Sequence, residues 1–278
     1  MAKLSEVIIR LSSISKMKNM KEEDLFTFIS KREKSKIPGR LLKRYAVEKL
    51  NIKGNDCYAL SPREGKSDNA VLFIHGGAYI LDMDDYHWHA VDGIIKKTSA
   101  TVYVPIYPLA PEHTYIETEL MIDALYEKIT KEHKRVSVIG DSAGGQIAIK
   151  LLSKSDLKAK DLILVSPLVY LYPDSELIEE MKSIEEKDIM LSVDFIRIVS
   201  KWWTKGNIFT YGDVNSIKKV SIFVGTNEIL YPHALRLASN IEDCEVYEGK
   251  QLMHTWPYMP GDKECAAGFK TICDIINK

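Results

Sequence analysis

Short apolar runs recur along the chain from about residue 46 and set the expected fold. Five are nearly uninterrupted, as in strands buried on both faces of a sheet: residues 71–74, 101–106, 136–139, 162–165 and 220–224. A hairpin over 47–60, with a turn at Gly54-Asn55, and a last strand around Val246-Tyr247 complete the set. Apolar residues at helical spacing lie between these runs, for example over 116–129. This alternation predicts an α/β fold with a mostly parallel central sheet flanked by helices.

Two regions depart from the alternation. The first region, residues 1–45, has helical patterns over 4–14 and around Leu25–Ile29. The second region, at about 170–215, has no good strand signal. That second region holds an acidic helix over 175–184 and a helix from Ser192 that carries Trp202 and Trp203. We expect the tryptophans to pack their helix onto its own domain rather than line a pocket. The predicted organisation is a sheet domain over 46–278, with a small helical cap made of the insertion at about 170–215 and the N-terminal helices.

The composition of the chain limits the classes of partner that we expect. The chain has 278 residues, a formal net charge of −1, 45% hydrophobic and 28% charged residues, so neither nucleic acid nor an anionic membrane is an expected partner. The basic stretch over 31–44 lacks interleaved aromatic residues and is interpreted as a solvated surface. The N-terminus lacks the apolar core of a signal peptide, and no uncharged apolar run approaches the roughly 20 residues of a membrane span. These features favour a soluble, cytoplasmic protein.

The four cysteines, at 57, 244, 265 and 273, have no CxxC spacing and are expected to be reduced thiols. His87 and His89 lie near Asp82, Asp84 and Asp85, but no further ligand set recurs, so we expect no metal and no cofactor.

The most informative stretch is Gly140-Asp141-Ser142-Ala143-Gly144-Gly145, between a buried strand pattern and a helix pattern. Gly-x-Ser-x-Gly in that context is typical of a nucleophile elbow, a sharp turn that exposes the serine hydroxyl above a helix N-terminus. Small residues at Gly140 and Gly144 would let the strand and helix approach closely. Taken alone, the pattern also fits an ordinary glycine-rich turn.

A serine nucleophile needs a base and an acid that orients the base. His254 follows the last strand pattern in a short loop and is the candidate base. Glu228 lies three residues after a glycine that ends a strand pattern and is the candidate acid, with Asp213 and Asp243 as weaker rivals. The order serine, acid, histidine is that of α/β-hydrolases.

Donors for a tetrahedral oxyanion are expected in His75-Gly76-Gly77-Ala78, directly after the strand pattern at 71–74. The N–H groups of Gly76, Gly77 and Ala143 would together make a three-donor oxyanion hole.

With these residues in place, the chain resembles the hormone-sensitive-lipase-like family of α/β-hydrolases, which includes many bacterial carboxylesterases and acetyl esterases. The resemblance rests on His75-Gly76-Gly77-Ala78, the Tyr107–His113 stretch, Gly140–Gly145, the acid loop 225–230 and the histidine loop, and it extends over about 46–276. It implies that Glu112 is structural and that the Tyr107–His113 stretch supports the floor of the site. The family usually has aspartate where this chain has Glu228, and the short insertion would suit a fairly open pocket.

The expected function is a serine carboxylesterase that hydrolyses small, short-chain acyl esters through an acyl-enzyme intermediate. The same triad also serves amide cleavage of the formamidase type, which stays open as an alternative. A non-catalytic small-molecule receptor on this fold is a third hypothesis, disfavoured because His254 is present in its loop. Self-association is common in the family, so a homodimer is possible.

Overall fold

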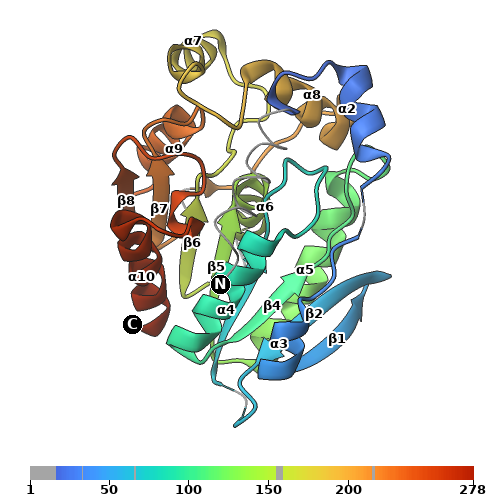
Figure 1. Ribbon diagram of the computed structural model, residues 1–278, viewed down its shortest axis with the longest axis vertical. Coiled ribbons are helices and arrows are strands. Elements are labelled where there is room, and N and C mark those ends of the chain that lie inside the picture. The colour runs from blue at the N-terminus through green and yellow to red at the C-terminus, as the bar shows by residue number, and fades with distance from the viewer. Residues whose placement is uncertain (1–16, 33, 66, 155–158, 215–216) are drawn as a thin grey trace.

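A computed structural model describes residues 17–32, 34–65, 67–154, 159–214 and 217–278. Its centre is an eight-stranded sheet with the order β1-β2-β4-β3-β5-β6-β7-β8 (Figure 1). The strands are β1 (Ala46–Ile52), β2 (Asn55–Ser61), β3 (Asn69–Ile74), β4 (Thr101–Pro105), β5 (Arg135–Asp141), β6 (Asp161–Val165), β7 (Val220–Gly225) and β8 (Cys244–Gly249). β1 and β2 pair antiparallel, as do β2 and β4. All pairs from β4 through β3 to β8 are parallel.

Helices cover both faces of this sheet (Figure 1). Their bounds are α2 (Glu22–Ile29), α3 (Gly39–Arg44), α4 (Asp85–Thr98), α5 (Tyr115–Glu132), α6 (Ala143–Leu152), α7 (Ser175–Ile184), α8 (Val193–Thr204), α9 (Tyr231–Ala238), the 3₁₀ turn η2 (Trp256–Tyr258) and α10 (Lys263–Asn277).

Strand β3 shows why its apolar run is continuous. Leu72 and Ile74 belong to the core that contains residues of α5 and α6. Val71 and Phe73 point to the opposite core, with residues of α4 and α10. Successive side chains of a strand face opposite sides, so a strand covered on both faces needs apolar residues at every position. The same geometry brings the carboxyl ends of the parallel strands to one edge of the sheet.

Helices α2, α7 and α8 lie beyond that edge, at the top of Figure 1. α2 and α8 are far apart in sequence but in contact: the Trp202 indole N–H donates to Glu22 at 2.8 Å, and Phe26 packs edge-on against Trp202. Trp203 is buried and stacks on Tyr79 with ring centroids 4.4 Å apart. Trp203 therefore packs the helix onto its own domain, as the sequence suggested.

The expected α/β fold is confirmed, and most strands extend one or two residues beyond their apolar runs. One detail was wrong: the β1–β2 turn is at Lys53-Gly54, both with positive φ, rather than at Gly54-Asn55. The helix expected over 4–14 lies outside the described residues. All four cysteines are free thiols. Among the helices that the structure describes, none combines the length and apolar character needed to cross a bilayer.

Candidate active site

Ser142 lies at the sharp turn from β5 into α6. Its φ of 49° falls in the left-handed region, a strained conformation for a residue other than glycine. A Cβ on Gly140 would lie 2.4 Å from the Gly144 carbonyl oxygen, and one on Gly144 would lie 2.1 Å from that of Ile74. Neither position has room for a side chain, so the tight turn depends on both glycines, as predicted. The turn places Ser142 at the N-terminus of α6.

Glu228 and His254 meet at the same edge of the sheet. Glu228 follows β7 by three residues, His254 follows β8, and both side chains are buried. The His254 Nδ1–H donates to Glu228 Oε2 at 2.5 Å. This leaves Nε2 with the lone pair and free to accept a proton. No hydrogen bond joins the Ser142 hydroxyl to His254 in the described part of the chain. Such contacts often close only when substrate binds.

Ser166, directly after β6, supports this pair and was not predicted from the sequence. Its hydroxyl donates to Glu228 Oε1 at 2.7 Å and accepts the N–H of Thr255, next to His254, at 2.9 Å. The Gly225 N–H also donates to Glu228 Oε1, at 2.6 Å. Both oxygens of the buried carboxylate are therefore hydrogen-bonded, and Ser166 links the acid loop to the histidine loop.

The electrostatic surroundings of His254 favour its protonated form. Burial alone would lower the pKa of His254, but the neighbouring Glu228 carboxylate, together with Asp188 and Asp141, raises it above its ordinary value. A raised pKa makes the imidazole a stronger base and stabilises the imidazolium that proton transfer would create.

The His75-Gly76-Gly77 loop lies beside Ser142, since a Cβ on Gly76 would come within 3.0 Å of the Ser142 Cβ. The expectation of three oxyanion donors needs a correction here. The Gly76 N–H donates to Asp141 Oδ2 at 3.0 Å, so it is not available to a substrate oxygen. The N–H groups of Gly77 and Ala143 take part in no hydrogen bond within the described residues. Two of the three expected donors, the N–H groups of Gly77 and Ala143, are therefore left as candidates for an oxyanion hole.

Sequence comparison agrees with this geometry. A family model for the alpha/beta hydrolase fold matches residues 71–257, well over half of the chain, and spans Ser142, Glu228 and His254. The chain belongs to the alpha/beta hydrolase family. An esterase of Acinetobacter venetianus is 26% identical over 198 residues, which are 66% of this hydrolase and 64% of the relative. The match thus spans just under two thirds of that relative's length. An acetyl-hydrolase of Streptomyces hygroscopicus is 25% identical over 73% of this chain and 71% of its own.

Solved structures share the fold over almost the whole length. A Staphylococcus aureus protein provisionally described as an esterase has a TM-score of 0.85 at 24% identity and covers 94% of the hydrolase and 95% of itself. A hormone-sensitive lipase from a metagenome library has a TM-score of 0.78 at 19% identity, and the match covers 99% of this chain and 97% of that one. The resemblance to hormone-sensitive-lipase-like hydrolases is thereby confirmed.

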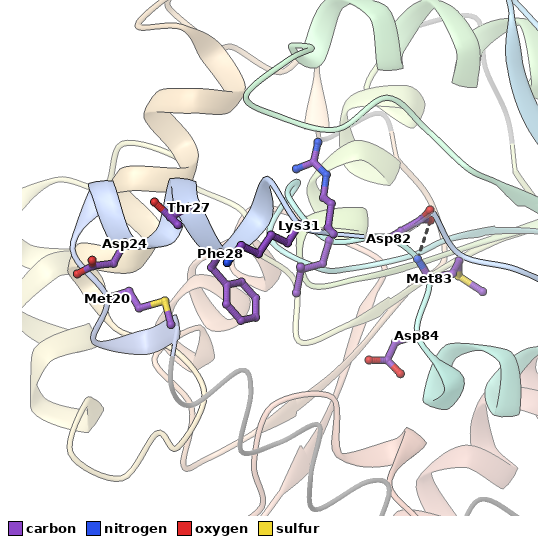
Figure 2. A pocket seen from close by; sticks show the side chains of 10 residues that line it. Met20, Asp24, Thr27, Phe28, Lys31, Asp82, Met83 and Asp84 are labelled. Atoms are coloured by element: carbon purple, nitrogen blue, oxygen red, sulfur yellow. Dashed lines mark hydrogen bonds between the residues drawn. The ribbon is translucent and has the colours of Figure 1, made fainter.

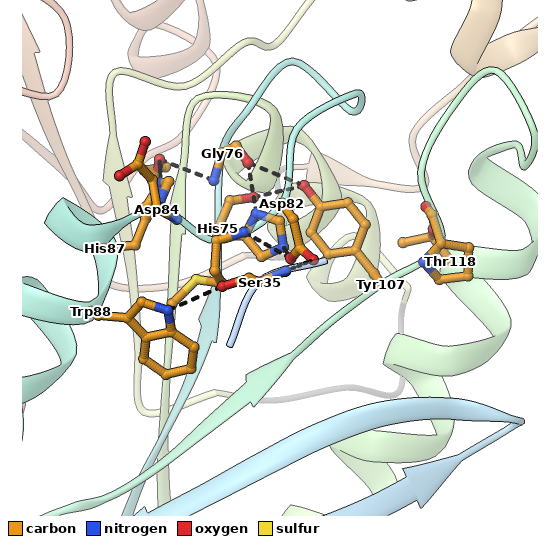
Figure 3. A network of polar contacts seen from close by, with 12 residues as sticks. Ser35, His75, Gly76, Asp82, Asp84, His87, Trp88, Tyr107 and Thr118 are labelled. Carbon is orange, nitrogen blue, oxygen red and sulfur yellow. Dashed lines mark hydrogen bonds and ion pairs between the residues drawn. The ribbon is translucent and has the colours of Figure 1, made fainter. Parts of the chain in front are cut away.

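A buried polar network surrounds the His75-Gly76-Gly77 loop (Figure 3). The Asp84 N–H donates to His87 Nδ1, so the ring proton of neutral His87 is on Nε2, which donates to Asp141 Oδ2 at 3.2 Å. Asp141 Oδ2 therefore receives two donors, His87 and the Gly76 N–H. Asp141, the residue before Ser142, thus fixes the loop that carries Gly77.

His75 is a second buried histidine in this network, but it carries no charge at neutral pH. Burial lowers its pKa to about 4, although Asp82 Oδ1 lies 3.8 Å from Nε2. The ring stacks on Tyr107, whose hydroxyl donates to the His75 carbonyl oxygen at 2.8 Å (Figure 3). Tyr107 thus supports the loop as the resemblance implied. Glu112 acts at one remove: its carboxylate pairs with Arg32, which donates to the main-chain oxygens of Ile80 and Ala110.

A cavity of about 550 Å³ lies between α2 and the segment 81–84. Figure 2 shows Met20, Asp24, Thr27 and Phe28 on one side, with Asp82, Met83 and Asp84 across from them. Its lining includes none of Ser142, Glu228 and His254.

The fairly open pocket expected from the short insertion stays a prediction. Ser142 is only 8% exposed. The insertion does not stand alone at this edge of the sheet, because α2 packs on α8.

The rival acids do not meet His254. Asp243 is exposed and lies directly before β8, at the opposite end of the strand from the triad, and Asp213 is exposed within the insertion. Two side chains near the acid carried no recognisable sequence signal. A serine after a strand and an aspartate in the insertion are ordinary there, and only the fold brings Ser166 and Asp188 to Glu228 and its neighbour Ile229.

Proposed function

We propose that this hydrolase is a serine carboxylesterase that cleaves small, short-chain acyl esters through an acyl-enzyme intermediate. The observation that carries the proposal is the buried Glu228–His254 pair at the same sheet edge as the strained Ser142 elbow. The relatives from Acinetobacter venetianus and Streptomyces hygroscopicus, an esterase and an acetyl-hydrolase, support the same chemistry.

In the first half of the reaction the Ser142 Oγ attacks the acyl carbon while His254 Nε2 takes its proton. Glu228 holds the imidazole in the required tautomer and stabilises the imidazolium. The negative charge that develops on the carbonyl oxygen accepts hydrogen bonds from the Gly77 and Ala143 N–H groups. One such donor typically contributes about a hundred- to a thousand-fold in turnover.

Collapse of the tetrahedral intermediate releases the alcohol, which takes the proton from His254. Water then attacks the acyl-enzyme, again with His254 as base, and frees the carboxylic acid. We place α2, α7 and α8 as a cap over the acyl or alcohol side of the site, since they lie beyond the carboxyl edge of the sheet. A short cap of this kind suits acyl chains of about two to eight carbons, whereas a lipase for insoluble fat usually exposes a larger apolar surface.

The test is a panel of p-nitrophenyl esters of increasing acyl length, with matched p-nitroanilides. We expect the highest kcat/KM on acetate to octanoate esters, much slower anilide cleavage, and loss of ester turnover in a folded Ser142→Ala variant. Full activity in the Ser142→Ala variant would contradict the proposed mechanism. Faster anilide cleavage would indicate an amidase of the formamidase type, and preference for long-chain emulsions would contradict the short-chain assignment.

A further inference from the structure

Asp188 is a buried carboxylate that the proposed reaction does not use directly. It lies between α7 and α8, in the insertion, and is 2% exposed. Oδ1 accepts the N–H groups of Met190 and Leu191 at 2.8 and 2.9 Å, which shapes its own loop. Oδ2 instead accepts the Ile229 N–H at 2.8 Å, across 41 residues of sequence.

That third bond reaches the acid loop at the residue after Glu228. Ile229 is fully buried, so without Asp188 its N–H would lose its partner. The Glu228 carboxylate is fixed on its other side by Ser166 and Gly225. Asp188 thus holds the main chain of the acid loop while those two groups hold the carboxylate.

The segment that carries Asp188 is itself anchored to the N-terminal region. The Lys18 ammonium donates to the main-chain oxygens of Glu185 and Asp188, at 2.8 and 2.5 Å. The Ser192 hydroxyl donates to the Lys18 carbonyl oxygen at 2.7 Å. Residues near 18, the segment 185–192 and the acid loop therefore form one hydrogen-bonded unit beside the triad.

We propose that Asp188 is a positioning residue of the ester-cleaving reaction: it ties the insertion to the acid loop and holds Glu228 in register with His254. The inference rests on the proposed function. Its charge also matters, because the carboxylates of Glu228 in the acid loop, Asp188 in the insertion and Asp141 in β5 all raise the pKa of His254. Each favours the imidazolium, as a negative charge close to a histidine does.

The test compares Asp188→Asn with Asp161→Asn. Asp161 is also buried and hydrogen-bonded, but it lies at the amino end of β6, away from the triad. kcat and KM for p-nitrophenyl butyrate are measured from pH 5 to 9, with thermal unfolding of each variant. For Asp188→Asn we expect kcat to fall about ten- to a hundred-fold, as for an acid misplaced by a fraction of an ångström, with KM nearly unchanged.

The pH profile separates positioning from mere stabilisation. Removing a negative charge near His254 lowers the pKa of its imidazolium, so the acidic limb of kcat/KM should move to lower pH, by about half a unit. The Asp161→Asn variant should lose thermal stability without a change in kcat or in the acidic limb of the pH profile. An Asp188→Asn variant with unaltered kcat and limb would overturn the inference, whatever its stability.

If Asp188→Asn does not fold, Asp188→Glu carries the test. It keeps the charge but displaces the carboxylate from the Ile229 N–H. It should lower kcat and leave the acidic limb in place, and an unaltered kcat would overturn the inference. Absence of ester turnover by the unaltered hydrolase would overturn the proposed function and this inference together. Turnover with unaltered Asp188→Asn kinetics would overturn this inference alone.

Discussion

Replacement of Glu228 by glutamine probes the acid with almost no change of shape. Oε1 of the carboxylate accepts two donors, the Gly225 N–H and the Ser166 hydroxyl, while Oε2 accepts only the His254 Nδ1–H. The glutamine oxygen is therefore expected to stay at the Oε1 position, because an amide NH₂ there would face the Gly225 N–H. The NH₂ group then points at His254 Nδ1.

This orientation forces the wrong tautomer. His254 Nδ1 must become an acceptor, which moves the ring proton to Nε2, where the base needs its lone pair. The corresponding Asp→Asn change in a serine-protease triad costs about 10⁴ in kcat, which corresponds to roughly 5.5 kcal/mol of transition-state stabilisation. We expect a loss of the same order for Glu228→Gln, since its carboxylate is fully buried and contacts the imidazole directly.

The assay is p-nitrophenyl butyrate hydrolysis under saturating substrate, with Asp243→Asn as the matched control. Asp243 is exposed at the other end of β8, so its variant should keep kcat within about two-fold, as is usual for surface changes. Circular dichroism and thermal unfolding check that both variants fold. A Glu228→Gln variant within ten-fold of the unaltered kcat, or an equal loss in Asp243→Asn, would refute the assignment of the acid.

Three further predictions concern the surroundings of the triad. Ser166→Ala should lower kcat about ten-fold at nearly constant KM, because Glu228 loses one donor; loss of stability with unaltered kcat would contradict this. Gly77→Ala should lower kcat at least about a hundred-fold, since a Cβ would lie 2.5 Å from the Leu81 carbonyl oxygen and Gly77 has a φ of +107°. In the control Gly39→Ala the added Cβ has no atom within 4 Å, so kcat should stay unchanged. Burial lowers the pKa of His233 to about 3. The unfolded chain therefore binds a proton below about pH 6.5 that the folded chain does not, and roughly 3 kcal/mol of stability is lost between pH 7 and 4.5. Urea unfolding at both pH values should show this loss reduced in His233→Gln, and equal losses would refute the role of His233.

The sheet was predictable because parallel strands covered on both faces require apolar residues at every position. The run Val71–Ile74 therefore marked β3 without ambiguity, and the turn that follows Val136–Ile139 was marked by glycines that no other residue could replace. The weakly patterned hairpin was predicted with its turn one residue out of place, since positive φ at Lys53 depends on the local backbone rather than on a pattern.

Two kinds of feature could not be predicted from the sequence: the direction in which a backbone N–H points, and contacts between residues far apart along the chain. A His-Gly-Gly pattern indicates an oxyanion loop, but it does not say which N–H points outward. The fold decides this, by turning the Gly76 N–H toward Asp141. Asp188 and Ile229 are 41 residues apart, and no local spacing relates them. Motifs indicated the proposed nucleophile, base and acid, whereas the side chains that contact them, such as Ser166, are brought there by tertiary packing.

If Ser142 is an activated nucleophile, as proposed, a fluorophosphonate should label it. Labelling followed by intact-mass measurement and peptide mapping is the most direct test. We expect one adduct per chain, on the peptide that contains Ser142, formed slowly in Glu228→Gln and absent in Ser142→Ala. An unlabelled chain, or an adduct that persists in Ser142→Ala, would contradict the proposal.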